Sequence, residues 1–374
     1  MTEKACGIVC EYNPFHNGHR YQYEQIRETL GLTAVCAMSG SFVQRAEPAC
    51  MDKSLRARQA VAGGASVVLE VPFPYSCLTA ERFAAAGVSV LARSGMCSHI
   101  AFGSECADVG ALTEIAAALT DSSVAKEIRD FQKERPDTSY ARARQGVLNR
   151  VLGERMGQIC SNPNDILGIE YIKAIRTSGA ELIPVALART TARTGGPNGA
   201  FASSSHVRAL LWEHDAESAA AYVPDAGILE NFTRYERFRE ALHLLLTFKE
   251  PRELAGICEY GGGIEHAVSR AARTARSYEE MFRLLRCKTL TDAKLRRMLL
   301  FGALGVSEKT AGEPLLYTAV LAAADDERTA ELLRCARREK QMIIARRVSA
   351  VRKDAAAMRQ YRRNELAEKL LAWG

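Results

Sequence analysis

The sequence lacks the features that mark membrane and secreted proteins. None of its apolar runs approaches the roughly 18 to 20 residues that a membrane-spanning helix needs. The first ten residues, MTEKACGIVC, do not have the regions that make up a signal peptide. The eleven cysteines are scattered and form no CxxC pair, which argues against a disulfide framework and a zinc ribbon. We therefore expect a cytoplasmic protein with no resident metal and no membrane contact.

The front of the chain has no net positive charge, and the whole excess of Lys and Arg lies in the C-terminal part. Residues 231–374 hold 28 Lys and Arg against 19 Asp and Glu, a balance of +9. Residues 1–230 hold the remaining 22 against 25, a balance of −3, which together give the net charge of +6. Such a split is typical of a part that binds a polyanion, most often nucleic acid. A solvated helical surface is the alternative that composition leaves open.

The first half of the chain alternates between two kinds of pattern. Short apolar, β-rich runs closed by Gly, Pro, Ser or Asn are followed by amphipathic helical segments. This alternation predicts βαβ units and a Rossmann-like parallel sheet, an α/β fold. The predicted strands are ACGIVCEY (5–12), TAVCAMSG (33–40), ASVVLEVPF (65–73), HIAFGSE (99–105) and AELIPVALA (180–188), the last after a helical insertion at about 107–178.

The β signal disappears after about residue 225, and helical spacing takes over. We therefore expect a catalytic domain over residues 1–215 and a mainly α-helical, basic domain over residues 216–374. Within the second domain, residues 334–363 contain eleven Lys and Arg and two acidic residues. The spacing predicts one cationic helix there, with Met342, Ile343, Ile344 and Val348 on its buried side.

Two histidines lie one helical turn apart where the first predicted strand gives way to a helix. The stretch NPFHNGH places His16 and His19 three residues apart, so both rings can face one side of a helix start. Ligands of open α/β sheets bind beyond the carboxyl ends of the strands, where helix N-termini point. Gly18 has no side chain and lets a ligand approach the backbone. The pattern favours binding of phosphate oxygens that gain charge in a transition state, over a surface turn.

The HNGH stretch resembles the HxGH signature of the nucleotidyltransferase superfamily, relatives of class I aminoacyl-tRNA synthetases. These enzymes attack the α-phosphate of a nucleoside triphosphate and release pyrophosphate. SSSHVR, residues 203–208, is similar to the serine motif with which many of them bind phosphate at a late helix N-terminus. Ser203, Ser204 and Ser205 would offer hydroxyls and backbone N–H groups, and Arg208 a charge. The serines also suit an ordinary helix N-cap, and both roles can hold together.

A longer series of motifs resembles one family, the tRNA(Met) cytidine acetate ligases. The motifs run in the family's order from residue 7 to about 208 and include MSGSFVQRAEP, ERFAAAGVSVL, AFGSE and PNDILGIEYIKAI. The resemblance implies an ATP-dependent ligase that forms acetyl-adenylate from acetate, releasing pyrophosphate. The acetyl group then passes to N4 of the wobble cytidine of elongator tRNA(Met), giving N4-acetylcytidine and AMP. ATP would arrive with magnesium. Nothing in the sequence calls for an obligate protein partner.

The same resemblance implies which residues bind ATP. His16 and His19 would be catalytic. Gly103, Asn164 and Arg189 also have structural readings, as a strand end, a helix cap and a surface charge. Arg45, in the loop SGSFVQRAEP, has a phosphate or RNA contact and a purely structural loop as equal alternatives. The ATP-binding set implied by the family is Val9, Cys10, Glu11, Tyr12, Asn13, Pro14, Phe15, His16, Asn17, Gly18, His19, Arg20, Tyr21, Gln22, Gly103, Asn164, Arg189, Ser203 and Arg208.

The chain departs from the family's pattern at three places. Ser41 replaces an asparagine, residues 190–201 replace an aromatic-His-Asp segment, and His206 stands where a small residue is common. None of these touches HNGH, so adenylate formation is the firmer expectation. The alternative function is a small-molecule nucleotidyltransferase of cofactor biosynthesis, which shares HxGH but seldom has a large basic helical part. A non-catalytic RNA-binding protein is a further alternative, against which the intact His16, Gly18 and His19 speak.

Overall fold

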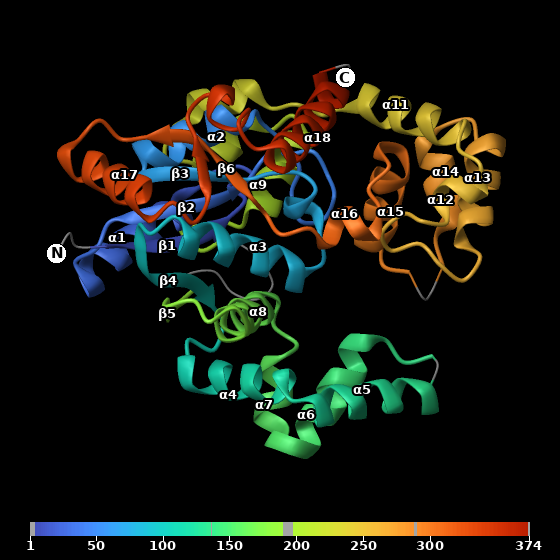
Figure 1. Ribbon diagram of the computed structural model, residues 1–374, viewed down its shortest axis with the longest axis horizontal. Helices are drawn as coiled ribbons and strands as arrows, with labels where there is room; N and C mark the ends of the chain where they lie inside the picture. The colour runs from blue at the N-terminus through green and yellow to red at the C-terminus, as the bar shows by residue number, and fades with distance from the viewer. Residues whose placement is uncertain (1–3, 136, 190–196, 288–289, 373–374) are drawn as a thin grey trace.

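The computed structural model describes residues 4–135, 137–189, 197–287 and 290–372, which build one seven-stranded sheet surrounded by helices (Figure 1). The strand order is β5-β4-β1-β2-β3-β6-β7. The five strands from the first half are parallel to one another, as the sequence predicts. Their bounds are β1 Ala5–Cys10, β2 Ala34–Ser39, β3 Ala65–Val71, β4 Cys97–Ser104 and β5 Ile183–Ala188.

Alternate residues of the central strands feed two cores, one on each face of the sheet. Ala5 of β1 belongs to the core that includes Leu91 of α3 (Ala80–Arg93). Cys6 and Ile8 belong to the other core, together with α1 (Asn17–Leu30) and α2 (Lys53–Ala62). This is the period of two expected for a strand that is covered on both faces. The α3 helix packs closely, because a Cβ at Gly87 would lie 2.6 Å from the Val9 side chain.

The segment between β4 and β5 is helical, as predicted, and projects below the sheet in Figure 1. Its last helix returns to the sheet, where Tyr171 packs against Phe102 of β4 with ring centroids 5.7 Å apart. This return brings the start of that helix to the carboxyl end of β4. The helices are α4 Val109–Thr120, α5 Ser122–Glu134, α6 Tyr140–Leu152, α7 Glu154–Ile159 and α8 Pro163–Ser178.

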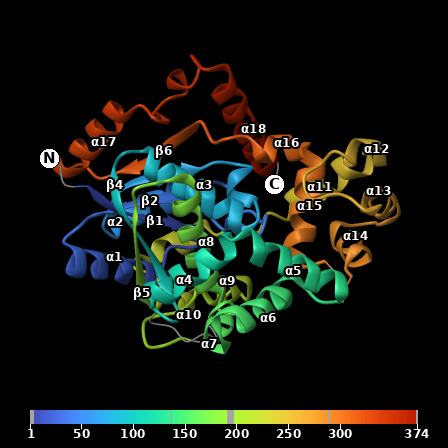
Figure 2. The same cartoon turned by 60° about the horizontal axis from the view of Figure 1, so that its bottom comes forward.

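Two short helices and a helical unit follow β5. The unit lies at one end of the sheet, on the right in both views (Figures 1 and 2), and packs around Leu242, Leu246, Leu295 and Leu299. The bounds are α9 Ser204–Trp212, α10 Ala216–Ala220, α11 Glu236–Thr247, α12 Pro251–Leu254, α13 Ile264–Thr274, α14 Tyr278–Leu285, α15 Asp292–Leu304 and α16 Glu308–Gly312.

The expectation that β structure ends near residue 225 is wrong. Strand β6 (Tyr317–Ala323) pairs antiparallel with β3, and β7 (Ile343–Ala345) pairs parallel with β6. The sequence of β6, YTAVLAA, mixes three strand-favouring residues (Tyr, Thr and Val) with three alanines, so its local preference for a strand is divided. Its conformation comes from the exposed edge of β3, whose backbone N–H and C=O groups need partners.

The prediction of a single cationic helix over residues 334–363 is also wrong. Helix α17 (Glu327–Glu339) ends at Lys340, which has a left-handed backbone with φ 50°. Ile343 and Ile344 then lie in β7, and a separate helix, α18, covers Ala355–Ala372. Pairing with β6 supplies the hydrogen bonds that would otherwise have come from a continuous helix.

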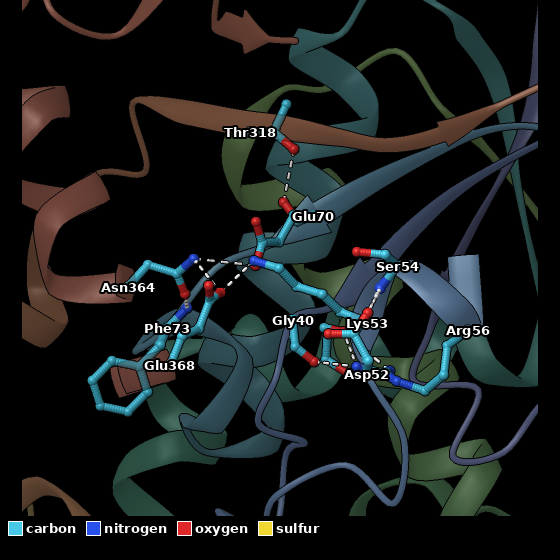
Figure 3. A network of polar contacts seen from close by, with 11 residues as sticks. Gly40, Asp52, Lys53, Ser54, Arg56, Glu70, Phe73, Thr318, Asn364 and Glu368 are labelled. Atoms are coloured by element: carbon cyan, nitrogen blue, oxygen red, sulfur yellow. Dashed lines mark hydrogen bonds and ion pairs between the residues drawn. The ribbon is translucent and has the colours of Figure 1, made fainter. Parts of the chain in front are cut away.

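Helix α18 is tied to the sheet by a buried polar cluster at the end of β3 (Figure 3). Glu70 of β3 accepts from Lys53 Nζ at 2.7 Å and from Asn364 Nδ2 at 3.2 Å. Lys53 also pairs with Glu368, so both carboxylates share one ammonium. Asn364 Oδ1 accepts the Phe73 N–H at 2.9 Å. The last helix of the chain is therefore part of the sheet's packing.

Candidate active site

A cavity of about 390 Å³ opens at the carboxyl ends of β1, β4 and β5. The N-terminal ends of α1, α8 and α9 reach it, bringing Gly18, Asn164 and Ser204 to its wall. Three helix starts that converge on one space give it a positive backbone potential, which suits a phosphate-bearing ligand. Both histidines of the HNGH stretch line the cavity.

His16 and His19 are fixed by the backbone of their own turn. His16 is the N-cap of α1, and its Nδ1 accepts the N–H of Gly18 at 3.1 Å. The Nδ1 of His19 accepts the N–H of His16 at 3.2 Å. The two rings stack with centroids 3.6 Å apart and an interplanar angle of 18°. The turn thus forms a reciprocal capping box in which imidazoles replace the usual hydroxyl and carboxylate.

These bonds decide where each ring carries its proton. An Nδ1 that accepts a backbone N–H has no hydrogen, so the neutral ring is protonated at Nε2. Burial lowers the pKa of His16 to about 3, and the nearby Arg189 charge adds to this effect. Burial, followed by His16 and Arg189, lowers the pKa of His19 well below its usual value. At neutral pH the pair therefore offers two uncharged Nε2–H donors on one side of the cavity.

Aromatic packing and a glycine hold the two rings in place. Tyr12, which has a left-handed backbone with φ 46°, turns the chain out of β1 and packs its ring 4.7 Å from that of His19. The ring of Phe15 packs against those of Tyr12 and His19, with centroids 5.0 and 5.6 Å away. A Cβ at Gly18 would lie 3.0 Å from Cε1 of His16. Glycine at this position thus leaves room for the His16 ring, which a larger residue would have to displace.

Opposite the histidines, Arg189 is held by a chain of hydrogen bonds. Its Nη1 donates to Asn164 Oδ1 at 3.1 Å, and Asn164 Nδ2 donates to Glu105 Oε1 at 2.6 Å. The side chain of Arg189 also packs beside Gly103, where a Cβ would lie 3.4 Å from its Cγ. Gly103, Asn164 and Arg189, which are distant in sequence, therefore form one wall of the cavity, as the motif series implies.

Two acidic residues that the sequence analysis missed position this wall. Asp165 is fully buried and accepts from Ser104 Oγ, from the N–H groups of Glu105 and Cys106, and from Asn162 Nδ2. Glu105 accepts the N–H of Asp165 at 3.0 Å as well as the Asn164 amide. The sequence did offer a signal for them, because Glu105 lies in FGSE and Asp165 in PNDILG. A strand end and a helix start that bind the same ligand need side chains that hold them together.

The serine motif lies at the start of α9. Ser203 caps this helix through its hydroxyl, which accepts the N–H of His206 at 3.2 Å, and Ser204 donates to the carbonyl of Pro14. Ser203 and Ser204 line the cavity beside the histidines. Arg208 Nη1 donates to the carbonyl of Asn13, which ties α9 to the HNGH turn from the outside. The helix cap and the cavity wall are therefore formed by the same serines.

Glu11 and Arg45 complete the cavity on the side of β2. The Glu11 carboxylate accepts the N–H of Gln44 at 2.9 Å, and burial raises its pKa above the usual value. Arg45 lines the cavity and is exposed. Below them, the fully buried Arg56 donates to the carbonyls of Glu11, Ser39, Gly40 and Met51, which fixes the ends of β1 and β2 (Figure 3 shows its contact with Gly40).

The cavity gathers most, but not all, of the residues implied by the family resemblance. Asn17 donates from its amide to the carbonyls of Ala200 and Ala221, and Phe15 packs beneath the turn. The lining includes Val9, Cys10, Glu11, Tyr12, His16, Gly18, His19, Tyr21, Gln22, Gly103, Asn164, Arg189 and Ser203. Outside the lining lie Asn13, Pro14, Phe15, Asn17, Arg20 and Arg208, of which Asn13 and Arg208 line a neighbouring cavity.

The departures from the family's pattern are placed as follows. Ser41 lies outside the lining, and its carbonyl accepts the N–H of Ala49. The ring of His206 packs edge-on against Tyr222, 5.5 Å away. Of the segment 190–201, residues 190–196 are outside the described part of the chain.

The described part of the chain contains no group of three or more His, Cys, Asp or Glu placed to hold a metal ion. None of its helices combines the length and the apolar character needed to cross a bilayer.

Comparison with known proteins agrees with the motif series. Residues 3–372 match the HIGH Nucleotidyl Transferase family. The chain is 34% identical over 310 residues to the tRNA(Met) cytidine acetate ligase of Bacillus velezensis, covering 79% of this chain and 74% of the relative. It is 32% identical to the enzyme of that name from Acetivibrio thermocellus, covering 82% and 78%.

Solved structures match over almost the whole chain. The crystal structure of Thermotoga maritima TmcAL bound with alpha-thio ATP superposes with a TM-score of 0.90 at 27% identity, covering 99% of this chain and 94% of that one. An apo form of the same protein superposes with a TM-score of 0.91. The α/β sheet with its helical insertion and additions is thus a known arrangement.

Proposed function

The chain belongs to the tRNA(Met) cytidine acetate ligase family of HIGH nucleotidyltransferases, and from this premise we propose that it is an ATP-dependent ligase that acetylates tRNA(Met). The acetyl group goes to N4 of the wobble cytidine of the elongator tRNA. The observation that carries the proposal is the pair of neutral, stacked histidines whose Nε2–H groups are left for the cavity. The alpha-thio ATP in the similar Thermotoga maritima structure supports ATP as the cosubstrate.

The first step joins acetate to AMP. An acetate oxygen attacks the α-phosphorus, the bond from that phosphorus to the bridging oxygen of pyrophosphate breaks, and pyrophosphate leaves with the electron pair. Charge grows on the phosphate oxygens during this step, so donors that are already in place lower its barrier. We assign this role to the Nε2–H groups of His16 and His19, with Arg189 and the start of α9 supplying positive potential.

The second step transfers the acetyl group. The N4 amine of cytidine attacks the acetyl carbonyl, the carbonyl–oxygen bond to AMP breaks, and the amine loses one proton. Magnesium accompanies ATP in this proposal, bound mainly through phosphate oxygens and water, which is its usual preference. That acetate is the carboxylic acid used is itself part of the proposal.

The proposal is tested by ATP–pyrophosphate exchange with a panel of carboxylic acids, followed by acetylation of an elongator tRNA(Met) transcript. Exchange that needs acetate, together with N4-acetylcytidine at the wobble position, is the expected result. Transfer of AMP to a small phosphate ester, with no modified cytidine, would replace this function by a cofactor-type nucleotidyltransferase.

A further inference from the structure

A second cavity of about 430 Å³ adjoins the catalytic cavity, between α9 and the helical unit of α11, α14 and α15. We call it the arginine cleft. Two of its residues come from the turn and helix that also form the catalytic cavity, namely Asn13 and Arg208. Its arginines come from four helices, from the segment before α11 and from the residue that follows α14. They are Arg208, Arg234, Arg239, Arg283, Arg286 and Arg296.

The lining of the arginine cleft is strongly positive. Its six arginines face two acidic lining residues, Glu47 and Glu279, which leaves a formal charge of +4. The charged residues lining the catalytic cavity are Arg45, Arg189 and Glu11, and its two histidines are neutral. A concave surface with this excess attracts a polyanion and raises its local concentration.

Aromatic rings lie among these arginines. The guanidinium carbons of Arg286 and Arg296 each lie 5.6 Å from the ring centroid of Phe282, and that of Arg234 lies 5.2 Å from Trp212. Trp212 is 39% exposed. Aromatic faces beside cations are the surface on which unpaired bases stack while their phosphates are neutralised. A protein partner with acidic side chains would use the charge but has no need of the rings.

Two arginines of the cleft, Arg239 and Arg283, have ion pairs loose enough to exchange for a phosphate. Arg239 lies 3.6 Å from Glu279, and Arg283 lies 3.8 Å from Glu280. The Arg283 side chain is 77% exposed. Exposed ion pairs of this length contribute little to the stability of the fold, so these arginines can exchange a carboxylate for a phosphate. Arg286 and Arg296 make closer pairs, with Asp292 and, at 3.0 Å, with Glu47.

Hydrogen bonds connect the wall of the cleft to the catalytic turn. Asn13 Oδ1 accepts the N–H of Cys50 at 2.6 Å, and the carbonyl of Cys50 accepts the N–H of Thr233 at 2.9 Å. Arg208 donates to the carbonyl of Asn13. A nucleic-acid strand bound in the cleft would therefore run along the rim of the cavity in which acetyl-adenylate forms.

We propose that the arginine cleft binds unpaired RNA nucleotides next to the cytidine that enters the catalytic cavity. The arginines take the phosphates, and Phe282 and Trp212 offer faces for bases. The inference rests on the proposed function, since it names how the RNA substrate is held. It places RNA binding on residues 208–296, at the junction with the catalytic part, in addition to the arginines near the C-terminus.

The test compares two matched double variants. Arg239→Gln with Arg283→Gln removes two charges from the cleft. Arg252→Gln with Arg270→Gln removes two charges from exposed positions of α12 and α13 in the same helical unit, away from the cleft. Binding is measured with a hairpin of the elongator tRNA(Met) anticodon stem and loop and with a fully paired RNA of equal length, at several salt concentrations.

We expect the cleft variant to bind the hairpin about tenfold more weakly, with a slope of log affinity against log salt smaller by about 1.4, or roughly 0.7 for each lost phosphate contact. The control variant should change binding less than twofold. A third variant, Phe282→Leu, keeps an apolar side chain and should weaken the hairpin by about tenfold while leaving the paired RNA unchanged. Acetate-dependent exchange should stay normal in all three.

Each other outcome has a defined meaning. Equal losses in the cleft and control variants, or normal hairpin binding by the cleft variant, overturn the inference and leave the cleft to a different anionic partner. If the wild-type protein shows acetate-dependent exchange and acetylates tRNA in that case, the proposed function stands without the cleft. If the wild type acetylates no tRNA at all, the proposed function itself fails.

Discussion

The catalytic cavity and the arginine cleft both draw residues from the histidine turn and from α9, but they are built in opposite ways. In the cavity, two neutral histidines are fixed by backbone hydrogen bonds, ring stacking and burial. In the cleft, six arginines come from several elements of the chain, and some of them are largely exposed. Stabilising a transition state requires donors that do not move, whereas holding a flexible strand requires charge and stacking faces. The following predictions test this difference.

The largest effect should come from the histidines. His16→Ala and His19→Ala should each lower acetate-dependent exchange by about 100-fold or more, the scale of losing one preorganised donor. His16→Ala should also destabilise the fold by about 1 kcal/mol, because α1 loses its N-cap. Exchange kinetics and urea unfolding measure both changes. RNA binding serves as the control and should stay normal. Near-normal exchange by both folded variants would make the catalytic assignment wrong.

A smaller loss is expected on the opposite wall. Arg189→Met removes the cation that bonds Asn164 and lies beside Gly103, and should raise the KM for ATP about tenfold, in the range of one hydrogen bond to a charged group. Steady-state exchange at varied ATP gives this number. An unchanged KM would leave Arg189 as a surface charge, the simpler reading that the sequence allows.

The C-terminal arginines should matter less than the cleft. Arg346, Arg347, Arg352 and Arg362 are exposed, and Arg363 lies 3.6 Å from Glu313. Changing all five to Gln should weaken tRNA binding about threefold, flatten its salt dependence and leave exchange untouched. Filter binding beside the exchange assay separates the two. A larger loss than in the two-residue cleft variant would reverse the order proposed above, and lost exchange would mean that this segment supports the active site.

The smallest effect is expected from pH. Because His16 has a lowered pKa of about 3 and that of His19 is also lowered, exchange should change less than twofold between pH 5.5 and 8 from these groups. An acid limb centred near pH 6.5 that disappears in both histidine variants would contradict neutral rings. The free energy of unfolding should also fall as the pH falls, because the histidines of the unfolded chain bind protons at a pH where those of the folded protein do not. The stabilisation is present above about pH 6.5 and is lost as pH falls toward 3.

Local sequence was enough for the parts of the site that depend on near neighbours. The capping box uses bonds between residues two and three apart, so the spacing in HNGH carries its own geometry. The alternation of five strands with helices likewise predicts a parallel sheet, because each strand is followed by the helix that covers it. The wall formed by Gly103, Asn164 and Arg189 was predicted from family motifs, since their separation in sequence gives no local signal.

Other parts were decided only by distant contacts. Strand β6 exists because β3 leaves an edge to pair with, and α18 is held by Glu70 and Lys53, which lie 294 and 315 residues before their partners Asn364 and Glu368. Asp165 and Arg56 look like ordinary helix residues until the carbonyls and N–H groups around them are assembled. The sequence by itself determined the histidine turn, because its hydrogen bonds are local, and the class of fold, because strand and helix patterns alternate along the chain. The tertiary structure decided the strands added at the sheet edge, the neutral state of the buried histidines and the meeting of six arginines, because burial and charge density depend on residues that only folding brings together.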